Sequence, residues 1–230
     1  MTLFVHGFLG SVGDWTATLT EVSGRAIPIP RARSIEEAAD ALVPSTPCLI
    51  VGYSLGGRLA MLAAARSPGA FTGVIAVSAD PGNAGDDRTA LDAQRADHIE
   101  RSGLGAFVDA WYQAELWASL RSHRAFAPMV ERRRSVSPED AAWALRTYSA
   151  GLQPDLWGSL PADLTVVVGE EDPKYLAIGR RMAARGIPLH VVPSVGHAIP
   201  TEAPAALAGI VQSVALKASI DGQPKHSLHL

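Results

Sequence analysis

The segment Gly52-Tyr53-Ser54-Leu55-Gly56 constrains the fold of this chain more than any other. It follows the apolar run 48–51, of the kind that a strand buried on both faces needs, and it precedes an Ala- and Leu-rich helical pattern over 56–66. In a strand-turn-helix of this type, glycines admit a turn so tight that side chains would clash, and the serine is exposed at the sheet edge. The alternative is a glycine-rich turn with an idle serine. The strand before and the helix after favour a nucleophile elbow.

The rest of the chain alternates short apolar runs with helical patterns, which predicts an α/β fold with a mostly parallel central sheet flanked by helices. Strands are expected at 3–5, 48–51, 73–78, 164–168 and 189–192, and helices at 34–42, 56–66 and 203–218. Between 81 and 161 the strand signal stops and a helical pattern replaces it. We therefore expect a core of residues 1–80 and 161–220, a helical lid inserted at 81–160, and a flexible tail at 221–230.

Composition narrows the function classes. The 230 residues are 47% hydrophobic and carry a net charge of −3, which argues against disorder and gives no basic footprint for nucleic acid. The single cysteine, Cys48, excludes an internal disulfide and a cysteine zinc site. No leader pattern, membrane-spanning run, metal-ligand cluster or nucleotide-binding loop is seen. We expect a cytoplasmic protein without cofactor, metal, nucleic-acid or membrane partner, as a monomer or weak homo-oligomer.

A serine is a poor base or nucleophile until a histidine accepts its proton. The order expected after a nucleophile elbow is serine, then an acid, then histidine. Asp172 follows the predicted strand 164–168, and His197 follows the predicted strand 189–192, so both belong at the sheet edge that carries Ser54. Glu170 and Glu171 compete for the acid role, and the Asp-Pro turn after the strand favours Asp172. The sequence therefore predicts Ser54, Asp172 and His197 as a catalytic triad.

The loop His6-Gly7-Phe8-Leu9-Gly10 follows the first predicted strand and can aim a backbone N–H at a developing oxyanion. Phe8 N–H and Leu55 N–H are the candidate donors. The alternative for this loop is an ordinary glycine-rich turn. Its place beside the elbow in this topology favours the oxyanion hole.

Over essentially its full length the chain resembles the α/β-hydrolase superfamily. In detail it resembles the branch of 2-succinyl-6-hydroxy-2,4-cyclohexadiene-1-carboxylate synthases, which are lyases of menaquinone biosynthesis. The motifs that carry this resemblance are residues 6–11 with Asp14-Trp15, 52–60, 107–120, 153–156 and 169–175. Together they are far more specific than G-x-S-x-G alone.

The resemblance implies elimination of pyruvate from 2-succinyl-5-enolpyruvyl-6-hydroxy-3-cyclohexene-1-carboxylate. Ser54 would remove a proton from a carbon next to a ketone, His197 would activate Ser54, and Asp172 would orient His197. The N–H groups of Phe8 and Leu55 would hold the oxygen where negative charge builds. The alternatives are a serine esterase working through an acyl-enzyme, and an idle hydrolase fold used for binding.

The implied substrate carries three carboxylates, which arginine binds with paired hydrogen bonds. Arg58 lies one helical turn after Ser54, and it matches the arginine of the family's elbow motif. The resemblance further implies substrate contacts from Arg88, by its spacing from Asp92, and from Arg132, by its spacing from Trp111. Arg133 and Arg134 compete with Arg132, and a solvated surface cation is the alternative for each lid arginine. Tyr53 and Trp111 would line the pocket.

The sequence departs from the family pattern after His197. The family often carries a second histidine a few residues later, followed by an acid and a proline. Here Pro200 replaces that histidine, while Glu202 and Pro204 remain. The departure leaves the predicted triad intact and bears on rate or substrate fit.

Overall fold

The computed structural model describes residues 1–82 and 88–221. Within these ranges the strands form one parallel six-stranded sheet in the order β2-β1-β3-β4-β5-β6. The strands are β1 (Thr2–Val5), β2 (Arg25–Ile27), β3 (Cys48–Tyr53), β4 (Phe71–Val77), β5 (Leu164–Gly169) and β6 (Leu189–Val192). The predicted α/β class with a parallel sheet is therefore confirmed. The short edge strand β2 was not expected, because three residues give no readable alternation.

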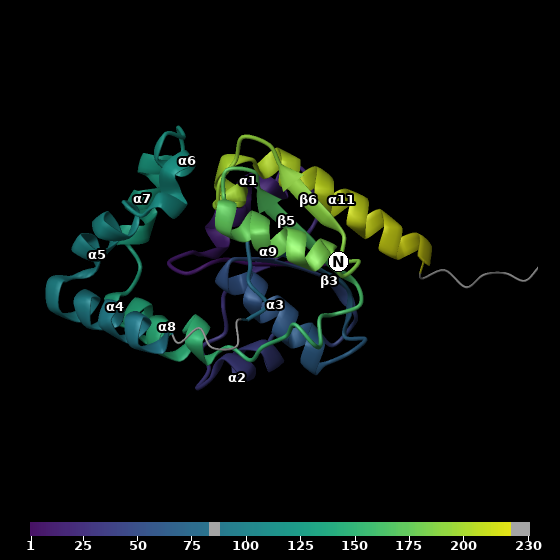
Figure 1. Cartoon of the computed structure of the whole chain (residues 1–230), viewed down its shortest axis with the longest axis horizontal. Coiled ribbons are helices and arrows are strands. Elements are labelled where there is room, and N and C mark those ends of the chain that lie inside the picture. The colour runs from purple at the N-terminus through teal and green to yellow at the C-terminus, as the bar shows by residue number, and fades with distance from the viewer. Residues whose placement is uncertain (83–87, 222–230) are drawn as a thin grey trace, which may run out of the picture.

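Helices cover both faces of the sheet (Figure 1). One face packs against α2 (Ile35–Asp40), α3 (Leu55–Arg66) and α9 (Pro173–Ala183), and the other against η1 (Val12–Trp15), α1 (Thr16–Leu19), α10 (Ile199–Glu202) and α11 (Pro204–Asp221). Neighbouring residues of β3 show why both faces are apolar. Ile50 points into the cluster with α3, whereas Leu49 and Val51 point into the cluster with α11.

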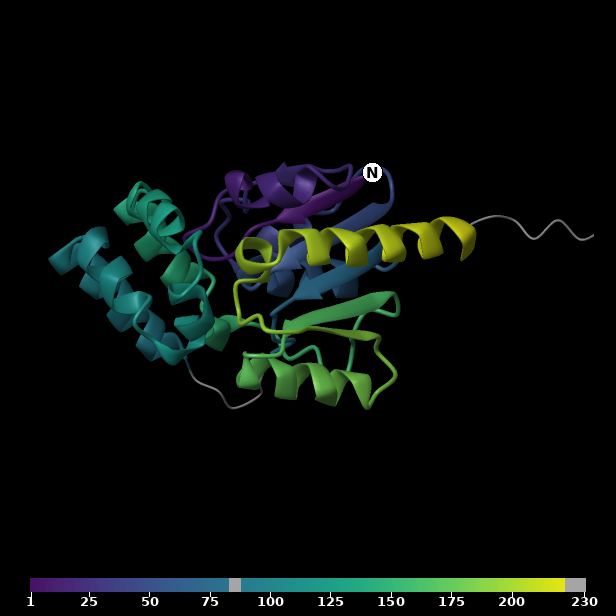
Figure 2. The same cartoon turned by 90° about the horizontal axis from the view of Figure 1, so that it is seen from above.

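A third group of helices lies beside the carboxyl edge of the sheet, the teal elements of Figures 1 and 2. It comprises α4 (Thr89–Ser102), α5 (Leu104–Trp111), η2 (Glu115–Trp117), α6 (Ala118–Arg121), α7 (Phe126–Arg134), α8 (Pro138–Thr147) and η3 (Ala150–Leu152). These helices have their own apolar core, which includes Ile99, Phe107, Leu120 and Leu145. We call them the helical layer; their action as a lid stays a prediction.

Two boundary details follow from local chemistry. Ser34 caps α2, since its hydroxyl accepts the Glu37 N–H at 3.2 Å. The Glu37 carboxylate, however, binds the Arg33 N–H instead of completing a capping box with Ser34. Apart from Asp221, the last residue of α11, the expected tail at 221–230 lies outside the described residues. In the part of the chain that is described, no helix is long and apolar enough to cross a bilayer.

Candidate active site

Ser54 stands on a strained turn between β3 and α3. Its φ of 53° and ψ of −112° lie in a region that non-glycine residues rarely adopt. A Cβ on Gly56 would lie 2.3 Å from the Val5 carbonyl oxygen, and one on Gly52 would lie 2.2 Å from the Gly56 carbonyl oxygen. The glycines are therefore required by close backbone approach, as the elbow motif predicted. The turn presents the Ser54 hydroxyl to the cavity between the sheet and the helical layer.

The predicted triad residues meet at this edge. His197 Nε2 lies 3.3 Å from Ser54 Oγ, and His197 Nδ1 lies 2.7 Å from Asp172 Oδ2. The His197 and Asp172 side chains are only 2% and 1% exposed. A buried carboxylate at Nδ1 fixes the tautomer in which Nε2 can accept the hydroxyl proton. The arrangement can thus deprotonate Ser54.

The competing acids lie elsewhere. Glu170 accepts the Ser194 N–H at 3.0 Å, and Glu171 is exposed. Asp172 has a second task as the N-cap of α9, because its Oδ1 accepts the Tyr175 N–H at 3.1 Å. Capping holds the carboxylate in one orientation, so its other oxygen faces His197.

The loop that carries His197 is held from both sides by Glu202. The Glu202 carboxylate accepts the N–H of Gly196 at 3.3 Å and that of Ala198 at 2.9 Å, the residues on either side of His197. The neighbouring Pro200, where the family often has histidine, is buried in α10. The departure from the family pattern therefore leaves the position of His197 supported by Glu202.

The two candidate oxyanion donors flank Ser54. Both Phe8 and Leu55 line the cavity that contains the Ser54 hydroxyl. Leu55 is the first residue of α3, where a backbone N–H has no partner within the helix. Within the described ranges, no hydrogen bond from either N–H to a protein acceptor is found. Both donors are thus available to an oxygen that gains negative charge at this site.

The cavity itself has a volume of about 130 Å³ and opens beside a larger one of about 980 Å³. The two share lining residues, among them Trp111, Trp117 and Lys174. The inner cavity brings together the triad serine and histidine, the two candidate oxyanion donors, and most of the predicted substrate residues, namely Tyr53, Arg58, Arg88 and Trp111. Aromatic rings enclose His197, with centroids 4.6 Å away for Tyr175 and 5.2 Å away for Trp117.

Arg58 is the innermost cation of this cavity. Its guanidinium donates to the Tyr148 carbonyl at 2.7 Å and to Gln153 Oε1 at 3.1 Å. Among the ion pairs of the described residues, none involves Arg58. Burial lowers the pKa of Arg58 to about 10. A partly buried guanidinium held by neutral acceptors is suited to bind an anionic group that enters the cavity.

Arg88 lies at the wall shared by the two cavities and is 3.9 Å from Asp92. Asp92 is already engaged by Arg95 at 2.8 Å and by the Ser149 hydroxyl at 2.8 Å. Among the described residues, Arg88 is therefore only weakly paired. Arg95 lies over the Trp111 ring, 4.9 Å from its centroid, on the side of the larger cavity.

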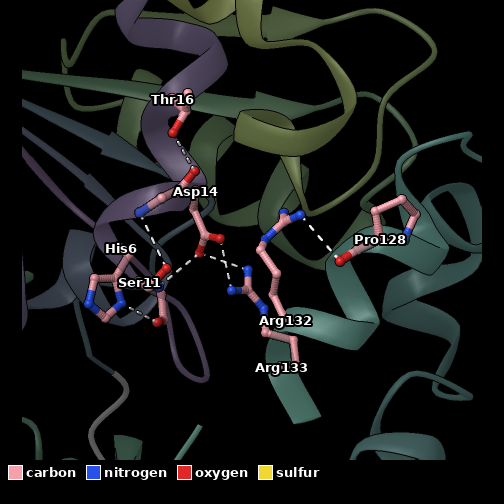
Figure 3. Close-up of polar contacts among 9 residues, drawn as sticks. His6, Ser11, Asp14, Thr16, Pro128, Arg132 and Arg133 are labelled. Atoms are coloured by element: carbon pink, nitrogen blue, oxygen red, sulfur yellow. Dashed lines mark hydrogen bonds and ion pairs between the residues drawn. The ribbon is translucent and has the colours of Figure 1, made fainter. Parts of the chain in front are cut away.

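The structure does not bring Arg132 to either cavity. Arg132 is exposed and donates to the Pro128 carbonyl at 3.2 Å (Figure 3). Neither competitor replaces it, since Arg133 is buried against Asp14 and Arg134 pairs with Asp109. Consecutive residues on a helix point about 100° apart, so spacing from Trp111 alone could not decide which face of α7 each arginine occupies.

Sequence reasoning missed several lining residues: Trp117, Tyr148, Gln153, Lys174 and Tyr175. Gln153, Lys174 and Tyr175 fall in motifs that carried the family resemblance, but no role was assigned to them. Lys174 could have been found, because it lies two residues after Asp172 in the first turn of α9. Burial raises the pKa of Tyr175 to about 12, so this phenol stays neutral beside His197.

Comparisons with known proteins identify the family of this chain. A model described as "Alpha/beta hydrolase family" matches residues 3–210. The chain is 30% identical to the 2-succinyl-6-hydroxy-2,4-cyclohexadiene-1-carboxylate synthase of Salmonella paratyphi C, covering 93% of this chain and 91% of that protein. It is also 32% identical to the chloroplastic protein PHYLLO of Arabidopsis thaliana, of which it spans only 14%.

Solved structures show the same fold. MenH from S. aureus superposes with a TM-score of 0.86 at 22% identity, covering 95% of this chain and 94% of that chain. A thermophilic esterase from Thermogutta terrifontis superposes with a TM-score of 0.78 at 23% identity, covering 94% and 89%. The chain belongs to the alpha/beta hydrolase family, and it is an enzyme of that family.

Proposed function

We propose that this enzyme is a carbon-oxygen lyase of menaquinone biosynthesis that eliminates pyruvate from 2-succinyl-5-enolpyruvyl-6-hydroxy-3-cyclohexene-1-carboxylate. The observation that carries the proposal is the Ser54-His197-Asp172 triad in a cavity whose innermost cation, Arg58, is held by neutral acceptors. A hydrolase of neutral esters has no need of such a cation. The similarity to a 2-succinyl-6-hydroxy-2,4-cyclohexadiene-1-carboxylate synthase over nine tenths of both chains supports the same reaction.

The proposed reaction begins with a proton transfer. His197 Nε2 accepts the hydroxyl proton of Ser54, and the Ser54 oxygen removes the proton from the ring carbon that bears the succinyl ketone. The electron pair moves onto the ketone oxygen, which the N–H groups of Phe8 and Leu55 stabilise by about 3–4 kcal/mol per donor. The electrons then return, the ring double bond shifts, and the carbon–oxygen bond to the enolpyruvyl group breaks. The leaving enolate takes up a proton to give pyruvate.

The three substrate carboxylates require cationic partners around the inner cavity. Arg58 is placed to bind the deepest one, and Arg88 binds a second at the wall between the cavities. Lys174 takes the third position, because it lines both cavities and no carboxylate pairs with it among the described ion pairs. Tyr53 and Trp111 line the inner cavity and supply aromatic walls for the substrate ring.

The test is a coupled assay of pyruvate release with the enolpyruvyl substrate. The wild-type enzyme is expected to release pyruvate, and Ser54→Ala to lose at least about 1,000-fold in kcat, as removal of a group acting directly on the reacting atom does. Ser67→Ala, at the distal end of α3, is the matched control and is expected to keep full activity. Absence of pyruvate release by the folded wild-type enzyme refutes the proposal.

Acyl transfer is the second candidate, since the same triad and oxyanion donors also serve a serine esterase. Arg58→Glu separates the two reactions. The lyase reaction is expected to disappear, because a carboxylate would face the substrate's carboxylate, whereas hydrolysis of a neutral ester should persist. Strong turnover of simple esters without pyruvate elimination favours the esterase.

A further inference from the structure

The loop that follows β1 is folded around one buried carboxylate. After His6, whose Nδ1 donates to the Gly7 carbonyl at 2.8 Å, the chain passes through Leu9 with a left-handed φ of 60°. Ser11 then caps η1, and its own N–H donates to Asp14 Oδ2 at 3.2 Å. Asp14 thus closes the loop that carries Phe8, the proposed oxyanion donor.

The same carboxylate binds the helical layer. Arg133 of α7 donates from both terminal nitrogens to the two oxygens of Asp14, at 2.8 and 2.7 Å (Figure 3). The two side chains are 6% and 4% exposed, although they lie 119 residues apart in the sequence. Such a pair is stable only when both partners are present, because either charge alone would be buried without compensation. Undocking α7 would therefore uncover the Asp14 carboxylate.

A second contact holds Phe8 itself. The Phe8 ring lies edge-on to Trp111 and Phe107 of α5, with centroids 5.5 and 6.3 Å away. The helical layer therefore contacts the loop at two places, through aromatic packing at Phe8 and through the ion pair at Asp14. Between them lies Leu9, whose left-handed φ of 60° is a conformation that non-glycine residues rarely adopt.

We propose that Asp14 and Arg133 are positioning residues whose ion pair fixes the Phe8 N–H in its place beside Ser54. The oxyanion hole is then complete only while α7 is docked on the loop. This inference rests on the proposed function, in which Phe8 N–H stabilises the developing oxyanion. Arg133 belongs to this pair rather than to the substrate pocket, since its guanidinium faces Asp14 and lines neither cavity around Ser54.

The experiment measures pyruvate release and amide hydrogen exchange in Arg133→Met, Arg133→Lys and the wild-type enzyme. In Arg133→Met we expect kcat to fall about 10- to 100-fold with little change in KM, since a misplaced donor costs transition-state stabilisation. Exchange of peptides covering residues 6–15 should rise at least about 10-fold. Arg133→Lys, which keeps the charge but not the fork, should recover part of both losses. The exposed change Arg101→Met, in α4 of the same helical layer, is the matched control and should alter neither readout.

Two results would overturn the inference. A raised KM with unchanged kcat and unchanged exchange would make Arg133 a substrate ligand. A lowered melting temperature with normal kcat and normal loop exchange at the assay temperature would make the pair merely structural. If Arg133→Met does not fold, the double variant Asp14→Asn/Arg133→Met removes both charges and is measured in the same way. Exchange of the loop does not require turnover, so it tests the ion pair even if the wild-type enzyme releases no pyruvate.

Discussion

Replacing Arg58 by methionine removes the innermost cation of the site while keeping an unbranched apolar stem. Two hydrogen bonds from a guanidinium to a carboxylate contribute at least about 1.5 kcal/mol each, or about 3 kcal/mol together. At about 1.4 kcal/mol per factor of ten, kcat/KM for pyruvate release should fall at least about 100-fold. Most of this loss should appear in KM, because the carboxylate is bound in the ground state as well as in the transition state.

The same substitution also touches stability, because it leaves the Tyr148 carbonyl and the Gln153 side chain without their donor. Each unsatisfied group costs about 1–3 kcal/mol if it stays dry, so urea unfolding must accompany the kinetics. Arg66→Met is the matched control, since Arg66 lies at the exposed end of the same helix and pairs with Asp40. A folded Arg58→Met enzyme that keeps kcat/KM within about fivefold of wild type would refute the assigned carboxylate contact, given the bond energies involved.

Three further outcomes are expected. Asp172→Asn should lower kcat by about 1,000- to 10,000-fold through the wrong His197 tautomer, without loss of the α9 cap. The exposed neighbour change Glu171→Gln should leave kcat unchanged, so equal rates for both variants would contradict this. Gly56→Ala should reduce the free energy of unfolding, measured by urea denaturation, by at least about 2 kcal/mol, because the added Cβ meets the Val5 carbonyl. Gly105→Ala, which has open space around its Cβ, should be neutral or stabilising. Because burial lowers the pKa of Arg58 to about 10, carboxylate binding should weaken as pH rises through that value; a KM that stays flat to pH 11 would exclude the neutralisation of Arg58.

The elbow and the order of the triad could be predicted from the sequence because their causes are local. A buried strand, glycines where no Cβ fits, and a helix that starts directly after the serine are all readable within residues 48–66. Asp172 and His197 could be placed because the carboxyl ends of parallel strands meet at one sheet edge. The fold class followed from the same alternation of strands and helices, and the sheet confirms it.

The direction in which a helical side chain points was decided only by tertiary structure. Arg132 and Arg133 are neighbours of equal charge, yet one is in solvent and the other is buried against Asp14, 119 residues away. No local pattern encodes that choice, because it depends on which face of α7 packs against the loop after β1. Lys174 lies close to Asp172 in the sequence, but only the structure shows that its side chain lines the cavities between α9 and the helical layer. Local sequence determines where the chain turns, and packing between distant elements determines which charges meet.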